Sequence, residues 1–72
     1  MKMKYKYIRF RKCLGYYEII SNSQGVVLGT IEWYKVWKQF CFIPKDNCIF
    51  SRSCMLDIAD FLDQLQKERP YT

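Results

Sequence analysis

Apolar and polar positions alternate along much of the region 4–50, and the spacing then becomes helical. Alternation in the segments 4–12, 16–20, 26–33 and 39–43 predicts β-strands, because successive side chains of a strand point to opposite faces. A short apolar stretch at 48–50 predicts a fifth strand. From residue 53 the apolar side chains recur three and four residues apart, which predicts a helix over 53–69 with an apolar stripe of Met55, Ile58, Phe61, Leu62 and Leu65.

Turn-forming residues separate most of these segments. Residues 13–15, 21–25 and 44–47 carry the Gly, Pro, Ser and Asn that favour turns, and the last of these predicts a hairpin. The connection at 34–37 has neither Gly nor Pro, so its geometry is the least defined. Ser53 is the expected N-cap of the helix, and Pro70 is the expected stop.

The first segment breaks its own alternation. Tyr5 and Tyr7 would share one face of a regular strand, whereas Ile8 and Phe10 would share the other. Two interpretations stay open: a bulge near Tyr7, or a strand whose two faces are both partly covered.

These elements predict one α+β domain over residues 1–72. Its sheet is an antiparallel meander of four to five strands within 4–50, and the helix 53–69 packs on one face. Half of the residues are apolar, and the two Trp, six Tyr and five Phe exceed what one sheet and one helix can hide. We therefore expect some aromatic side chains at the surface, where they often mark binding sites.

The charge is distributed unevenly along the chain. Residues 1–45 hold nine basic and two acidic residues (+7), and residues 46–72 hold three basic and five acidic residues (−2), which sum to the net charge of +5. This asymmetry indicates an anionic partner, and the residues we expect to bind an anion or nucleic acid are Lys4, Lys6, Arg9, Arg11 and Lys38.

A second interpretation of the N-terminal lysines is that they keep an edge strand soluble. If that edge is open, it would also permit a homodimer. The interleaved lysines and tyrosines of a regular strand fall on opposite faces, which weakens the nucleic-acid interpretation, because one face would lack either its charges or its rings.

The sequence lacks the groups that most enzymes use. It has no histidine, no glycine-rich phosphate loop and no nucleophile elbow, so we expect no catalysis. Asp57, Asp60 and Asp63 recur every three residues and are interpreted as a solvated helix face rather than a metal site. We expect no cofactor and no metal.

The four cysteines are interpreted as free thiols. The chain start has no apolar signal segment, and no apolar run approaches the length that spans a membrane. We therefore expect no membrane partner and a cytoplasmic location, where disulfides are rare. The spacing of Cys13, Cys41, Cys48 and Cys54 is also too wide for the usual paired zinc ligands.

The segment 29–44 is the densest in aromatic residues. Trp33 and Trp37 flank a bend, and two interpretations apply to both: core side chains that clamp the sheet to the helix, or exposed anchors of an interface. On the second interpretation, the candidate protein-interface residues are Tyr34, Lys35 and Trp37.

The same segment resembles a motif of small proteins from tailed bacteriophages and integrated prophages. The motif is Gly-x-Ile-x-Trp-Tyr-x-x-Trp-Arg-x-Tyr-x-Phe-x-Pro, followed by a Cys-x-x-Asp-Ile-x-Asp-Phe helix. The matching residues are Gly29, Ile31, Trp33, Tyr34, Trp37, Phe42 and Pro44, then Cys54, Asp57, Ile58, Asp60 and Phe61. The similarity covers residues 16–69, and Lys38 and Phe40 depart from its Arg and Tyr. It implies phage origin and brings no settled activity.

A small basic phage protein without catalytic groups is expected to act by occupying a surface. Our first hypothesis is an accessory protein in the bacterial host cell that binds and blocks a host protein, for example a component of a defence system such as a CRISPR effector. The alternative is a nucleic-acid or nucleotide binder that uses the basic N-terminal strand. A structural or assembly role ranks third.

Overall fold

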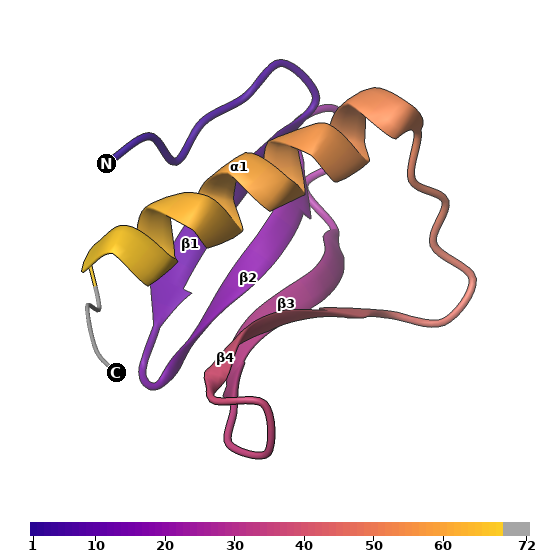
Figure 1. Cartoon of the computed structure of the whole chain (residues 1–72). Coiled ribbons are helices and arrows are strands. Elements are labelled where there is room, and N and C mark those ends of the chain that lie inside the picture. The colour runs from indigo at the N-terminus through magenta and orange to yellow at the C-terminus, as the bar shows by residue number, and fades with distance from the viewer. Residues whose placement is uncertain (69–72) are drawn as a thin grey trace.

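A computed structural model of the chain describes residues 1–68 and has the predicted α+β architecture. Four strands, β1 (Ile8–Cys13), β2 (Tyr16–Ser21), β3 (Val27–Tyr34) and β4 (Gln39–Pro44), form one antiparallel sheet in the order β1-β2-β3-β4. The helix α1 (Arg52–Glu68) lies across one face of this sheet (Figure 1). The meander with a C-terminal helix is therefore confirmed, with four strands rather than five.

The fifth strand does not form. Residues 45–51 are irregular and lead from β4 to the start of α1, and Phe50 packs edge-on against Phe42, with ring centroids 5.0 Å apart. The turn at 44–47 is present, with Asn47 at φ 63°, but it does not lead into a hairpin. The aromatic ring of Phe50 is thus used for core packing rather than for strand pairing.

The helix begins one residue earlier than expected, and its N-cap is Ser51 rather than Ser53. The Ser51 hydroxyl accepts a hydrogen bond from the backbone N–H of Cys54 (3.2 Å), and its carbonyl accepts one from Met55 (3.0 Å). These bonds satisfy N–H groups that the first turn of a helix leaves unpaired. The predicted end at residue 69 and the stop at Pro70 lie outside the described residues.

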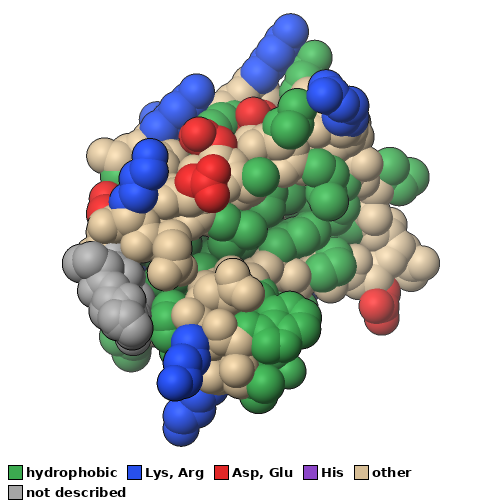
Figure 2. Space-filling model, viewed as in Figure 1, with side chains coloured by type: hydrophobic (Ala, Val, Ile, Leu, Met, Phe, Trp, Pro, Cys, Tyr) green, Lys and Arg blue, Asp and Glu red, His purple; other side chains and the backbone are tan. Residues whose placement is uncertain are grey.

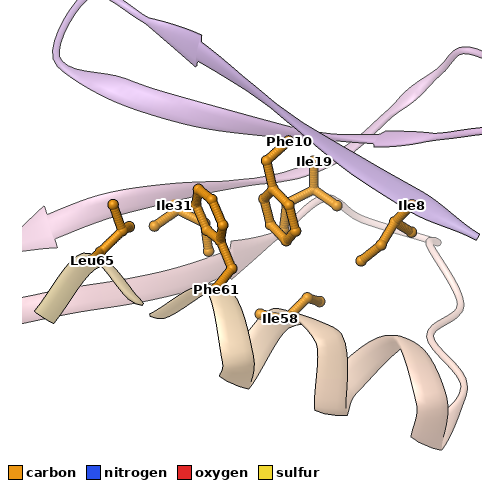
Figure 3. Packing of buried hydrophobic residues seen from close by; sticks show 7 residues of the cluster. All are labelled: Ile8, Phe10, Ile19, Ile31, Ile58, Phe61 and Leu65. Carbon is orange, nitrogen blue, oxygen red and sulfur yellow. The ribbon is translucent and has the colours of Figure 1, made fainter. Parts of the chain in front are cut away.

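The core lies between the helix and the covered face of the sheet (Figure 3). The rings of Phe10 and Phe61 are stacked, with centroids 3.9 Å apart, and Tyr17 meets Phe61 edge-on at 5.2 Å. The predicted stripe of α1 is only partly correct, because Met55 is exposed and Leu62 is half-buried. The buried core residues are Ile8, Phe10, Ile19, Ile31, Ile58, Phe61 and Leu65.

The broken alternation of the first segment is a reversal of the chain. Residues 4–7 are not a strand: the N–H of Tyr5 bonds the carbonyl of Ile8 (2.9 Å), and the N–H of Phe10 bonds the carbonyl of Met3 (2.8 Å). A single bridge pairs Lys4 with Arg9. The prediction of a strand over 4–12 is therefore wrong at its start, because the chain folds back along β1 instead of continuing it.

The N-terminal segment is also attached to the helix. The side-chain amide of Gln64 accepts a bond from the backbone N–H of Lys2 (2.7 Å) and donates one to the carbonyl of Lys2 (3.1 Å). The hydroxyl of Tyr5 donates to Asp60 (2.7 Å), and Asn22 donates from its side chain to the carbonyl of Tyr5 (2.8 Å). These contacts hold residues 2–7 against both layers.

Strand β3 shifts its register against β2 and lies close to β4. The pairing of β2 with β3 skips Leu28, which consequently packs against the core instead of alternating to the opposite face. At Gly29, a Cβ atom would lie 2.7 Å from the carbonyl oxygen of Ile43 and 3.0 Å from the Phe42 ring. Glycine at this position therefore permits the close approach of the two strands.

No helix of the described chain has the length and apolar character needed to cross a membrane.

Candidate protein-docking surface

The tip of the β3–β4 hairpin presents two aromatic side chains together. Residues 35–38 form the turn, and Lys38 closes it in the left-handed region at φ 52°. Trp37 is 65% exposed, and its ring lies edge-on against Tyr34, with centroids 4.9 Å apart. An edge-on aromatic pair limits the orientations of both rings. The tip therefore offers a partly ordered aromatic surface to solvent.

These rings border a hollow on the sheet face that α1 does not cover. The hollow has a volume of about 270 Å³ and is lined by Glu32, Trp33, Tyr34, Trp37, Cys41 and Ile43. Cys41 and Ile43 alternate with Phe40 and Phe42 along β4, so their side chains belong to the uncovered face. We use the name tip surface for five of these residues: Glu32, Tyr34, Trp37, Cys41 and Ile43.

The core interpretation fails for Trp37, and neither tryptophan belongs to the buried cluster. Trp33 is half-buried and packs edge-on against Phe40, with centroids 5.2 Å apart. The structure brings two of the three candidate interface residues, Tyr34 and Trp37, into contact, and places Lys35 in the turn beside them. Sequence reasoning missed Cys41 and Ile43, although the alternation in 39–43 already set them opposite Phe40 and Phe42.

A second hollow lies on the opposite face of β4. It has a volume of about 240 Å³ and forms between the start of β4 and the helix, lined by Gln39, Phe40, Ala59, Leu62, Asp63 and Gln66. The edge strand β4 therefore has a hollow on each of its two faces. Figure 2 shows apolar side chains gathered between the helix and the strands behind it, with basic side chains at the hairpin tip.

The structure brings three of the five predicted anion-binding residues together. Lys4 pairs with Arg9 across the N-terminal reversal, and Lys6 lies within that reversal. Arg9 donates to the side chain of Asn22 (3.2 Å), and Arg11 forms an ion pair with Glu18 that lowers the pKa of that carboxyl. Lys38 directly precedes β4, and β1 and β4 are opposite edges of the sheet.

The argument that lysines and tyrosines point to opposite faces does not hold, because residues 4–7 are not a regular strand. The ammonium of Lys6 lies 5.2 Å from the centroid of the Tyr7 ring, and that of Lys2 lies 4.5 Å from the Tyr5 ring. Each of these two lysines therefore lies over the ring of a tyrosine instead of pointing away from it. The Tyr7 ring is exposed, whereas the Tyr5 hydroxyl is engaged by the helix.

A broad depression of about 660 Å³ lies near the start of α1. It lies between the N-terminal reversal, the β2–β3 loop and the segment that precedes the helix, and Lys6 is the one predicted site residue that lines it. Its rim includes the polar side chains of Ser21, Asn22, Ser23 and Gln24.

Among the acidic residues Asp57, Asp60 and Asp63 of α1, Asp60 has a structural role, because it accepts a hydrogen bond from Tyr5. Burial, together with the hydrogen bond to Asp60, raises the pKa of Tyr5 well above its usual range, because ionisation would place a phenolate beside a carboxylate. All four cysteines are free thiols. Within residues 1–68, no three Cys, Asp or Glu side chains gather in a way that would hold a metal ion.

Comparisons of the chain with protein-family models, with curated proteins and with solved structures find no match.

Proposed function

We propose that this chain is a non-catalytic accessory protein of phage type that binds a host protein through the tip surface and blocks it. The observation that carries the proposal is the exposure of Trp37, which packs on Tyr34 at the edge of an apolar hollow. A tryptophan that is 65% exposed contributes little to the stability of the domain, so its place at the surface favours a role in binding.

Exposed aromatic pairs beside a hollow have the character of interface anchors. Tryptophan and tyrosine are enriched among the residues that dominate binding energies, and such residues act in pockets from which water is excluded. The aliphatic and thiol side chains of Ile43 and Cys41 would complete an apolar centre, and Lys35 and Lys38 would form part of a polar rim. The part of the proposal that names a host protein, for example one of a defence system, rests on the resemblance of residues 16–69 to phage proteins.

Affinity capture from bacterial lysate, with nuclease treatment, tests the proposal. Wild type should retain a protein that Trp37→Ala does not, and the same protein, once purified, should bind the wild-type chain directly. Truncation of an anchor costs about 2 kcal/mol or more, which corresponds to a loss of affinity of about thirtyfold. Binding should survive moderate salt, because buried aromatic contacts are not screened.

Tyr7→Ala is the matched control, since it also removes an exposed aromatic ring, but at the opposite edge of the sheet. Circular dichroism of both variants establishes that each is folded. Equal capture by wild type and Trp37→Ala, or equal losses from both substitutions, would show that the tip surface is not the docking site.

One observation favours nucleic-acid binding as a second candidate function. Lys6 lies over the exposed Tyr7 ring, and Lys4 and Arg9 pair in the same N-terminal reversal. This segment therefore combines an aromatic ring for base stacking with charges that can bind phosphates. Replacing Lys4, Lys6 and Arg9 with Gln should then abolish binding to a generic single-stranded oligonucleotide. Affinity should fall steeply with salt, with a slope of about −0.7 per phosphate contact.

A further inference from the structure

We propose that the bound segment of the partner is an extended strand with an apolar centre and acidic ends. This strand pairs with β4 and adds one strand to the sheet. This inference rests on the proposed function, because it specifies how the partner engages the same side of the molecule. In the described chain β4 is the last strand of the sheet and has β3 as its one strand neighbour. Its outer N–H and C=O groups are a template for another strand.

The sequence of β4 does little to discourage such pairing. Native edge strands are usually blunted by charged side chains, proline or bulges. Gln39–Pro44 contains no charged residue, and its proline stands at the last position. The strand pairs with β3 in unbroken register over all six residues. It is therefore a regular edge without a bulge over its whole length.

The two hollows beside β4 fit the geometry of an added strand. Side chains of a strand alternate between the two faces of the sheet, so those of a strand beside β4 would enter the two sides in turn. One face leads to the hollow at Trp37 and Ile43, and the other leads to the hollow between Phe40 and Leu62. Backbone pairing would supply affinity, and the two hollows would select apolar side chains.

Lysines stand at both ends of this edge. Lys38 directly precedes β4 and Lys45 directly follows it, while Lys35 lies in the same turn as Lys38. The six residues of β4 span about 20 Å when extended, so the two positive groups flank a segment of similar length. A complementary strand would carry Asp or Glu at each end.

The same lysines argue against a second copy of this chain as the occupant. In the antiparallel register that pairs all of β4 with itself, Lys38 of one copy faces Lys45 of the other, and Gln39 faces Pro44. Like charges directly opposite one another are destabilising, and proline has no N–H to donate. A foreign strand with acidic ends avoids both penalties.

Selection from a library of random linear peptides about ten residues long tests the inference on the purified full chain. The expected binders have β-forming apolar centres and acidic ends. Lys38→Glu with Lys45→Glu should weaken these binders at least about tenfold and should select peptides with basic ends instead. The control Lys4→Glu with Lys12→Glu makes the same change in net charge at the opposite, β1 edge of the sheet and should leave binding unchanged. Methylation of alternate backbone nitrogens in the peptide should also abolish binding, because it removes the donors of the ladder.

Four results would overturn strand pairing: no enriched peptide, enriched peptides that tolerate backbone methylation, indifference to the Lys38 and Lys45 changes, or a dimer in sedimentation that β4 variants dissociate. None of these would affect the proposed function, which depends on loss of the captured host protein with Trp37→Ala. If that loss occurs while strand pairing fails, the tip surface binds a folded surface rather than a strand.

Discussion

The two edge strands of the sheet, β1 and β4, differ in how far other segments of the described chain cover them. The β1 edge is covered over Ile8–Phe10 by residues 3–5, and Gln64 and Asp60 attach this segment to the helix. The β4 edge has a regular strand without charges, hollows on both faces and an exposed tryptophan at its end. Hydrogen bonds thus hold a covering segment on the β1 edge, whereas the β4 edge has apolar side chains exposed to solvent. That difference is the physical basis for assigning binding to the β4 side.

The largest expected effect on stability is in the core beneath β1 and β2. Phe61 is fully buried between Phe10 and Tyr17, so Phe61→Ala should cost about 3–5 kcal/mol of unfolding free energy, measured by urea denaturation. Phe40→Ala on β4 should cost clearly less, because Phe40 is only half-buried. Equal losses of unfolding free energy from Phe61→Ala and Phe40→Ala would mean that the chain is packed equally well beneath β1 and β2 and at β4.

A smaller effect is expected where β3 meets β4. Gly29→Ala would place its Cβ 2.7 Å from the carbonyl oxygen of Ile43, and backbone cannot move aside as a flexible side chain can. We expect a loss of about 1–3 kcal/mol in the same urea assay and shifted amide resonances along β4. Gln39→Ala, on exposed β4 surface, is the control and should change stability by less than about 0.5 kcal/mol. A neutral Gly29→Ala would show that the strands can separate without cost.

The attachment of the N-terminal segment predicts a pH dependence. Tyr5→Phe removes the hydroxyl that bonds Asp60 and Gln64 and should cost about 1 kcal/mol at neutral pH. Because folding raises the pKa of Tyr5, its contribution is complete below about pH 10 and is lost as the pH rises from there toward the folded pKa. The stability gap between wild type and Tyr5→Phe should therefore shrink above about pH 10. Tyr7→Phe, at an exposed ring, is the control and should leave the free energy of unfolding unchanged at neutral pH.

The smallest effect on stability is expected at the proposed anchor. Trp37→Ala should change the unfolding free energy by about 0.5 kcal/mol, because the ring is already mostly in water and only its contact with Tyr34 is lost. A loss above about 2 kcal/mol would identify Trp37 as a structural residue and would remove the main support for the docking surface.

Hydrophobic spacing was sufficient to predict the meander and the helix because both have regular periods. It failed where the chain reverses: residues 4–7 have strand-forming side chains, but hydrogen bonds from Asn22 to the carbonyls of Tyr5 and Lys6 hold them in the reversal. It also failed at 48–50, where packing of Phe50 on Phe42 replaces strand pairing. For the candidate site, the sequence identified Tyr34 and Trp37 but could not show that Trp37 stays exposed, since the connection 34–37 has no Gly or Pro to define its geometry. The hollow between β4 and α1 depends on the position of the helix, and the hollow on the uncovered face depends on the turn at 35–38; hydrophobic spacing encodes neither.

Hydrogen–deuterium exchange of the chain, with and without the captured host protein, tests the central claim most directly. The account predicts that amides of β4 and of the 35–38 turn become protected in the complex, while exchange at residues 4–9 is unchanged. Protection confined to residues 4–9, with β4 exchanging as in the free chain, would contradict it and would assign binding to the basic edge.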